Sequence, residues 1–217
     1  MDTFESTAVA PRRAFLLGMA RTAATLAIAG CRSAAATVPD IGAGRAAPSS
    51  KWDDSWTKRL GAHRTVFDFA EIEATPGMGQ IPPVMDAYNE VLGTTDHDLG
   101  FVLVVRHMAV TALLDDAMWN KYDLGADLKH KDPSTSAPFK RNPFRGLISL
   151  IQNRGVVLLG CNTALMGLGA MMAQREKKEM ATVQEEFRKA LFPGVILLPN
   201  GLYALSRAQE VGCGFMR

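Results

Sequence analysis

The sequence predicts an α/β protein, a three-layer α/β/α sandwich around a mainly parallel sheet of roughly five strands. Continuous apolar runs such as residues 101–105 (FVLVV) and 156–160 (VVLLG) are typical of strands that are covered on both faces. Segments with a helical spacing of apolar residues lie between these runs. This alternation favours parallel strands joined by crossover helices, with helices on both faces of the sheet.

The first half of the domain begins with a strand at residues 65–70 (TVFDFA), which is rich in β-branched and aromatic residues. A loop rich in Pro and Gly precedes a helix at 84–92, and Gly93 ends that helix. The buried strand 101–105 follows, and then a helix at 109–122. Residues 123–141 hold two prolines and a Ser/Thr cluster, which predict an exposed, inserted loop.

The second half opens with Asn142 as a helix cap and Pro143 at the first helical position, and this helix ends near Gly155. After the strand 156–160 come helices at 162–172 and 177–191, a strand at 195–198 and a helix at 201–211. Residues 213–216 form a short last strand. The methionines of the helix 162–172 indicate packing in the core or at a subunit interface, with a metal-binding methionine cluster as the rarer alternative.

The N-terminal segment resembles an export signal rather than part of the fold. Arg12 and Arg13 precede an apolar stretch that is short and broken by Arg21, as in a twin-arginine signal peptide at residues 1–36. The signal ends either at the small residues 34–36 or in a lipobox-like sequence before Cys31, which would then be lipidated. Residues 37–60 are expected to form a flexible linker, and 61–217 the domain. We therefore expect a periplasmic protein that contacts the membrane only if Cys31 is lipidated.

Composition narrows the classes of partner. The chain has 24 basic and 22 acidic residues and no basic stripe with interleaved aromatic residues, so nucleic acid is not an expected partner. The cysteines, Cys31, Cys161 and Cys213, are too few for a disulfide-framed secreted scaffold. The histidines lack the spacing of metal ligands, and neither a metal nor a cofactor is expected.

Sites in parallel sheets form where the strands end. Three pairs of residues follow predicted strands: Arg106 with His107, Cys161 with Asn162, and Pro199 with Asn200. Cys161 lies between a strand and a helix, where the partial positive charge of the helix N-terminus favours the reactive thiolate. The alternative is an inert, buried cysteine, since cysteine is among the most buried residue types.

A disulfide between Cys161 and Cys213 is not expected within one subunit. Cys161 ends its strand and Cys213 begins the last one, so in a parallel sheet they lie at opposite edges. A strand of five residues spans about 16 Å, whereas a disulfide joins Cα atoms no more than about 7 Å apart.

Three blocks in this order resemble the DsrE/DsrF-like (YchN-like) sulfur-relay proteins. They are FVLVVRHMAVTALL, GVVLLGCNTALMGLG and GVILLPNGLYALSRAQEVGCGFMR, and the resemblance covers most of residues 64–217. It implies the α/β/α fold, assembly into homotrimers or homohexamers, and Cys161 as a persulfide carrier that exchanges sulfur with a donor and an acceptor. The signal peptide, the insertion at 123–141 and Met108 depart from the family pattern.

Other residues receive supporting roles. His107 would lower the thiol pKa as a base or donate a hydrogen bond to a bound sulfur species, unless its ring only satisfies a nearby carbonyl. Arg106 would attract small sulfur anions such as thiosulfate or sulfite, unless it is solvated. Asn162 either caps the following helix or orients a bound group, and Asn200 is a further ligand-binding candidate.

Two other functions remain open. One is a non-catalytic module of the same fold that binds a small ligand while Cys161 stays inert. The other is an accessory subunit of an exported redox enzyme, which the export of already folded proteins by the twin-arginine route would explain.

Overall fold

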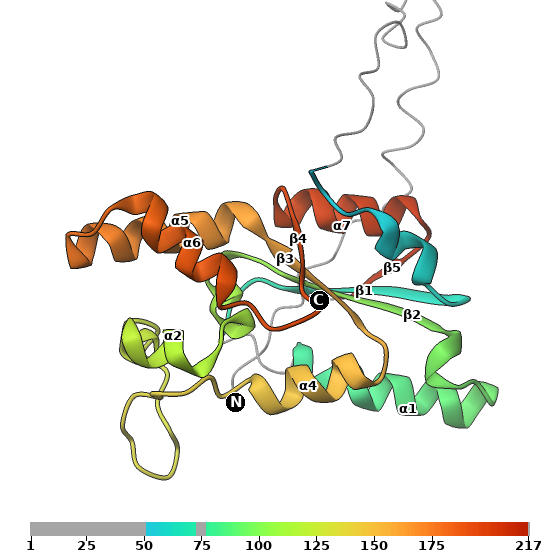
Figure 1. The fold of residues 1–217 in the computed structure, drawn as a ribbon. Helices are drawn as coiled ribbons and strands as arrows, with labels where there is room; N and C mark the ends of the chain where they lie inside the picture. Colours follow the sequence, from blue (N-terminus) through green and yellow to red (C-terminus); the bar gives the residue numbers. More distant parts are fainter. Residues whose placement is uncertain (1–50, 73–76, 217) are drawn as a thin grey trace, which may run out of the picture. The chain divides into compact units, whose positions relative to one another are not determined.

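Five parallel strands form one sheet in the computed structural model, which describes residues 51–72 and 77–216 (Figure 1). The spatial order is β4-β3-β2-β1-β5. The strands are β1 (His63–Phe69), β2 (Leu99–Val105), β3 (Val157–Cys161), β4 (Ile196–Leu198) and β5 (Gly214–Met216). Every neighbouring pair is parallel, so the predicted α/β class with its five-stranded parallel sheet is confirmed.

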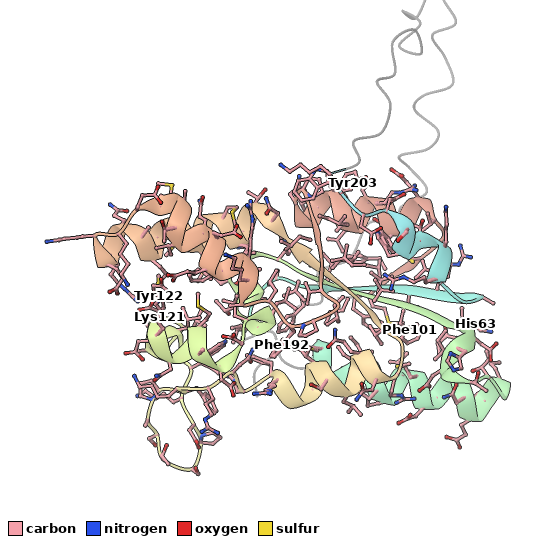
Figure 2. The ribbon with its side chains drawn as sticks, in the orientation of Figure 1. His63, Phe101, Lys121, Tyr122, Phe192 and Tyr203 are labelled. Atoms are coloured by element: carbon pink, nitrogen blue, oxygen red, sulfur yellow. The ribbon has the colours of Figure 1, made fainter. Side chains whose placement is uncertain are left out.

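The central strand β2 shows why an apolar run specifies this fold. All of its residues are buried, and successive side chains enter opposite faces of the sheet. Phe101, Leu103 and Val105 belong to one apolar core, whereas Val102 and Val104 belong to the other. Figure 2 labels Phe101 on the side of the sheet that α1 covers, where its ring and that of Tyr88 are nearly perpendicular, with 5.7 Å between the centroids.

Helices cover both faces and complete the sandwich. The helices α1 (Ile81–Leu92) and α4 (Arg145–Asn153) pack on the face of Phe101 and Leu103. The opposite face is covered by α7 (Gly201–Glu210) and the short 3₁₀ helix η1 (Ser55–Arg59). Figure 1 shows α7 on one side of the sheet and α1 with α4 on the other.

Further helices gather where β2 and β3 end, on the side where Figure 1 shows α2, α5 and α6. Here lie η4 (His107–Leu113), α2 (Asp116–Lys121), α3 (Leu124–Asp127), α5 (Asn162–Glu176) and α6 (Met180–Lys189), while η2 (Met78–Gln80) and η3 (Asp96–Asp98) precede α1 and β2. Leu165, Leu168 and Met172 of α5 are buried in the core. The apolar character of α5 therefore reflects core packing within the subunit for these residues.

The single helix predicted at 109–122 is wrong, because η4 and α2 are separate helices. Leu114 is extended and forms an isolated antiparallel bridge with Leu191. The amide of Asp115 donates to the carbonyl of Ala190 at 2.9 Å, and its carboxylate caps α2 by accepting from the amide of Met118. These tertiary hydrogen bonds outweigh the continuous helical spacing of the sequence.

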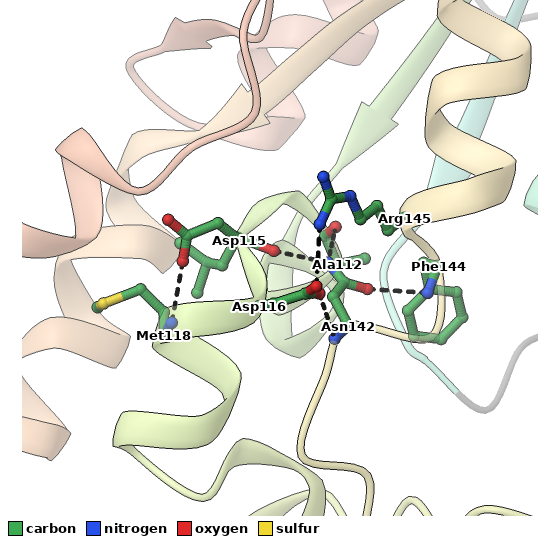
Figure 3. Close-up of polar contacts among 8 residues, drawn as sticks. Ala112, Asp115, Asp116, Met118, Asn142, Phe144 and Arg145 are labelled. Carbon is green, nitrogen blue, oxygen red and sulfur yellow. Dashed lines mark hydrogen bonds and ion pairs between the residues drawn. The ribbon is translucent and has the colours of Figure 1, made fainter.

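Asn142 does not cap a helix, because α4 begins at Arg145 with Phe144 before it. Its side chain instead joins the end of η4 to the start of α4 by hydrogen bonds (Figure 3), a contact that we call the Asn142 clamp. The Nδ2 atom donates to the carbonyls of Ala112 and Leu114, both at 2.7 Å, and Oδ1 accepts from the amide of Phe144 at 2.8 Å. Asn142 is 5 % exposed, so these bonds satisfy polar groups that water does not reach.

The predicted insertion is only partly an exposed loop. It contains α3, whose Leu124 is buried, and an isolated bridge between Lys131 and Pro138. A Cβ on Gly125 would lie 2.1 Å from the carbonyl oxygen of Phe139, so the loop packs directly against this glycine.

The folded unit begins before residue 61. Trp56 in η1 is fully buried beneath α7, and Leu60 joins the same core. The predicted linker 37–60 is therefore too long, because Trp56 and Leu60 are packed in the core. Burying the large apolar indole of Trp56 favours a folded segment here over a solvated one. The signal peptide, Cys31 and the linker up to residue 50 lie outside the described residues. No helix among the described residues is long and apolar enough to cross a membrane.

Candidate functional site

The carboxyl ends of β2, β3 and β4 enclose a cavity of about 600 Å³. Arg106 and His107 follow β2, Cys161 ends β3, and Asn200 follows β4. The structure thus brings these four predicted residues to one cavity, as the parallel topology requires. Asn162 is not among the residues that line it.

Cys161 is both the last residue of β3 and the N-cap of α5. Its Sγ atom accepts a hydrogen bond from the amide of Ala164 at 3.3 Å. The cap predicted for Asn162 is therefore wrong by one residue, since the sulfur occupies the position of the capping oxygen. An amide donor and the positive end of a helix of 15 residues both stabilise negative charge on this sulfur.

Arg106 forms a partly buried ion pair with Asp68. Its Nε and Nη2 atoms donate to the two carboxylate oxygens of Asp68 at 2.7 and 2.8 Å. The Asp68 side chain is 4 % exposed and that of Arg106 19 %. The hydrogen bonds to Asp68 raise the pKa of Arg106 above its ordinary value, and the negative charges of Asp68 and Glu71 act in the same direction. Arg106 is therefore fixed near the sulfur, with its charge matched by Asp68.

Gly201 allows α7 to approach this ion pair. A Cβ at Gly201 would lie 2.5 Å from the Cβ of Arg106 and 2.8 Å from its Cδ. Real Cβ atoms essentially never come this close, so any larger residue would push α7 away from the end of β2. Asn200 caps the same helix, because its Oδ1 accepts from the amide of Tyr203 at 2.8 Å.

His107 lies at the rim, where the chain leaves β2 with a left-handed conformation (φ 52°). Its Nδ1 atom is 3.2 Å from Oε1 of Glu71, and the two side chains are 69 % and 55 % exposed. His107 thus pairs with an exposed carboxylate, a partner that the sequence did not indicate. A solvated pair of this kind contributes little to stability.

The rest of the cavity wall is mainly apolar. It is lined by Met108, Ala164, Gly167, Leu168, Met171 and Leu202. Met171 and Leu202 are 54 % and 68 % exposed, so they form an apolar rim. Thr163 is the further polar residue of the wall, and its hydroxyl donates to the carbonyl of Pro199 at 2.9 Å.

Cys213 is a second buried free thiol, placed immediately before β5. Burial raises its pKa above the ordinary value. The structure records no bond between Cys161 and Cys213, in agreement with the prediction from strand direction. Among the described residues, no group of three His, Cys, Asp or Glu side chains is arranged to hold a metal ion.

Comparison with known proteins gives no family for this chain. No protein-family model matches it, and no curated protein does. A solved structure of a protein of unknown function from Methanobacterium thermoautotrophicum is similar over 71 % of this chain and 98 % of that one. The two share 16 % identity with a TM-score of 0.42.

Proposed function

We propose that this protein carries sulfane sulfur as a persulfide on Cys161, as the resemblance to DsrE/DsrF-like sulfur-relay proteins implies. The observation that supports this role best is the position of the thiol. Cys161 is the last residue of β3, and its Sγ atom accepts a hydrogen bond from the amide of Ala164 at the start of α5. The residue also lines a cavity of about 600 Å³. A nucleophilic sulfur needs stabilised negative charge and access for a reactant.

The reaction we propose is a sulfur transfer without net oxidation. The Cys161 thiolate attacks the outer sulfur of a donor persulfide, R–S–SH. A new S–S bond forms at Cys161 as the donor's S–S bond breaks, and the donor leaves as the thiolate R–S⁻. The outer sulfur keeps its proton or loses it to water. Transfer to an acceptor thiolate repeats the same exchange, with Cys161 as the leaving group.

The surrounding residues support this exchange in different ways. The amide of Ala164 and the N-terminus of α5 stabilise the thiolate when it attacks and when it leaves. The guanidinium of Arg106, held by Asp68, adds a fixed positive charge near the sulfur. His107 at the rim can exchange a proton with the outgoing donor thiol, while Glu71 orients its ring.

Mass spectrometry of the intact protein tests the proposal. After incubation with a persulfide donor, we expect a gain of about 32 Da per added sulfur that reducing agent removes. The Cys161→Ser variant should show no such gain, whereas Cys213→Ser should behave as the unaltered protein. An adduct that survives in Cys161→Ser, or that Cys213→Ser loses, would assign the chemistry to another residue.

Location and assembly belong to the same proposal. We propose an exported, periplasmic protein on the basis of Arg12, Arg13 and the apolar stretch that follows them. A homotrimer or homohexamer follows from the family resemblance. Sedimentation of the full chain and fractionation of cells that produce it test these two statements separately.

A non-catalytic binding module is the second candidate, because Arg106 is already paired with Asp68 and His107 lies beside the carboxylate of Glu71. In that case Cys161 would only pack and cap α5. A Cys161→Ala variant that keeps the full cellular activity would favour this candidate, whereas loss of activity supports the sulfur carrier.

A further inference from the structure

The guanidinium of Arg106 has one edge that its ion pair with Asp68 does not use. Nε and Nη2 donate to the two carboxylate oxygens of Asp68, and Nη1 makes no hydrogen bond among the residues that the structure describes. A guanidinium carries its N–H donors in a fixed plane, so the donors on its other edge stay available. Arg106 also lines the cavity of about 600 Å³, where a ligand can meet these donors.

The unused edge of this guanidinium is on the side of the strand that carries Cys161. The sheet order places β2 between β1 and β3, so Asp68 and Cys161 lie on opposite sides of Arg106. Because Nε and Nη2 point to Asp68, Nη1 is directed away from β1. Val105 of β2 is in register with Gly160 of β3. The residues that follow them, Arg106 and Cys161, are therefore neighbours on chains about 4.8 Å apart.

The side chains of Arg106 and Cys161 also lie on the same face of the sheet. Val104 of β2 and Leu159 of β3 belong to the apolar core beneath α7, and a side chain two residues further along a strand returns to the same face. At the start of α7, Gly201 packs against the Arg106 side chain and limits its movement. A nucleophilic sulfur and a fixed hydrogen-bond donor thus line one cavity side by side.

This arrangement suits an oxyanion that also carries a transferable sulfur. A guanidinium donates short, charge-assisted hydrogen bonds to oxyanions. Thiosulfate has oxygens that accept such bonds and a sulfane sulfur that a thiolate can attack. Because Asp68 balances the charge of Arg106, the attraction comes from the hydrogen bonds of Nη1 together with the positive end of α5 beside Cys161.

We propose that the sulfur donor of this site is a thio-oxyanion, of which thiosulfate is the simplest, and that Nη1 of Arg106 binds its oxygens while Asp68 holds the guanidinium in place. The inference rests on the proposed role of Cys161. The Cys161 thiolate attacks the sulfane sulfur, and a new S–S bond forms as that of thiosulfate breaks, with its electron pair passing to sulfite. The exchange is Cys161–S⁻ + S–SO₃²⁻ → Cys161–S–S⁻ + SO₃²⁻, and Arg106 stabilises the leaving sulfite.

A comparison of two donors tests the binding of the oxyanion. Mass spectrometry of the full-length protein measures the rates at which Cys161 gains sulfur from thiosulfate and from 2-hydroxyethyl persulfide, which has no oxyanion. In the variant that combines Asp68→Leu with Arg106→Met, the ratio of the thiosulfate rate to the persulfide rate should fall at least about tenfold, because a charge-assisted hydrogen bond is lost. Replacing both partners leaves no buried carboxylate unpaired, so we expect this variant to fold.

Two single changes serve as the second variant and the control. Arg106→Lys keeps a positive charge beside Asp68 but lacks the second edge of N–H groups, so the ratio should fall here as well. Arg145→Met is the matched control, because Arg145 also pairs with an aspartate, Asp116, but does not line the cavity. This change should alter neither rate. An unchanged ratio in both Arg106 variants, or an equal fall in Arg145→Met, would overturn the inference.

Failure of the two proposals can be told apart with sulfate, which has the shape of thiosulfate but no sulfane sulfur. Sulfate should slow the alkylation of Cys161 by iodoacetamide, relative to chloride at the same ionic strength, and the double variant of Asp68 and Arg106 should lose this protection. If sulfate protects but neither donor adds sulfur to Cys161, the anion site stands and the sulfur carrier fails. If the persulfide adds sulfur, but sulfate does not protect and the rate ratio is unchanged in the double variant, the sulfur carrier stands and the thio-oxyanion donor is refuted.

Discussion

Removing the guanidinium of Arg106 should destabilise the protein strongly, because it leaves the buried carboxylate of Asp68 without its partner. In Arg106→Met the carboxylate of Asp68, 4 % exposed, loses both of its side-chain hydrogen bonds to Arg106. The methionine side chain fills much of the same space. The change therefore tests the charge pair rather than a cavity.

Breaking a fully buried ion pair by removing one partner costs about 3–5 kcal/mol, and we expect a cost in this range because the carboxylate left behind is 4 % exposed, although Arg106 itself is only partly buried. For a chain of this size each kcal/mol lowers Tm by about 2–4 °C, so we expect a fall of roughly 6–20 °C. Replacing both partners, in Asp68→Leu with Arg106→Met, should restore much of the loss, because apolar pairs of similar volume replace buried ion pairs at little cost.

Urea unfolding of the four proteins of this cycle measures the coupling. The control is Arg145→Met, which breaks a pair with Asp116 whose side chains are 61 % and 28 % exposed. That change should cost under about 1 kcal/mol. If Arg106→Met costs no more than the control, or if the double variant is less stable than both single ones, the Arg106–Asp68 pair is not the fixed charge that we describe.

Three further predictions concern other parts of the molecule. Asn142→Ala removes three side-chain hydrogen bonds and should lower the free energy of unfolding by about 3 kcal/mol, at about 1 kcal/mol per bond; a loss below half of this in urea unfolding would contradict the clamp. Burial and the hydrogen bond to Glu186 raise the pKa of Tyr122 to about 12 from 10.0 (Figure 2 labels the side chain). The stabilisation from Tyr122 is therefore complete below pH 10 and disappears as the pH rises through about 12; ultraviolet titration should show a tyrosine ionising near that pH, and Tyr122→Phe should remove it, so an unchanged titration would refute the assignment. Both thiols are buried, but Cys161 lines an open cavity whereas burial raises the Cys213 pKa, so iodoacetamide should modify native Cys161 before Cys213; peptide mapping that finds Cys213 modified first would contradict this order.

The sequence was enough to predict the strands and the edge where the site forms. Apolar runs at 101–105 and 156–160 specify buried parallel strands, and chain order then brings Arg106, Cys161 and Asn200 to one edge. This inference needs only the direction of the strands and the short connections after them.

The partners of the site residues could not be predicted in the same way. Asp68 lies in β1, 38 residues before Arg106, and its pairing follows from the parallel register of β1 with β2. An acidic residue inside the run TVFDFA was the available signal, since a charge in a buried strand needs a partner. The split between η4 and α2 likewise depends on hydrogen bonds to Ala190, which no local pattern encodes.

The measurement that tests the central claim most directly is the amount of sulfane sulfur that Cys161 takes up and then releases to cyanide. The protein is loaded with a persulfide donor, separated from it, and treated with cyanide, which takes up sulfane sulfur as thiocyanate. We predict about one thiocyanate per chain and, by peptide mapping, loss of about 32 Da from the peptide that contains Cys161. Thiocyanate release that is unchanged in Cys161→Ser, or a loaded protein whose Cys161 peptide never carries the added sulfur, would contradict the account.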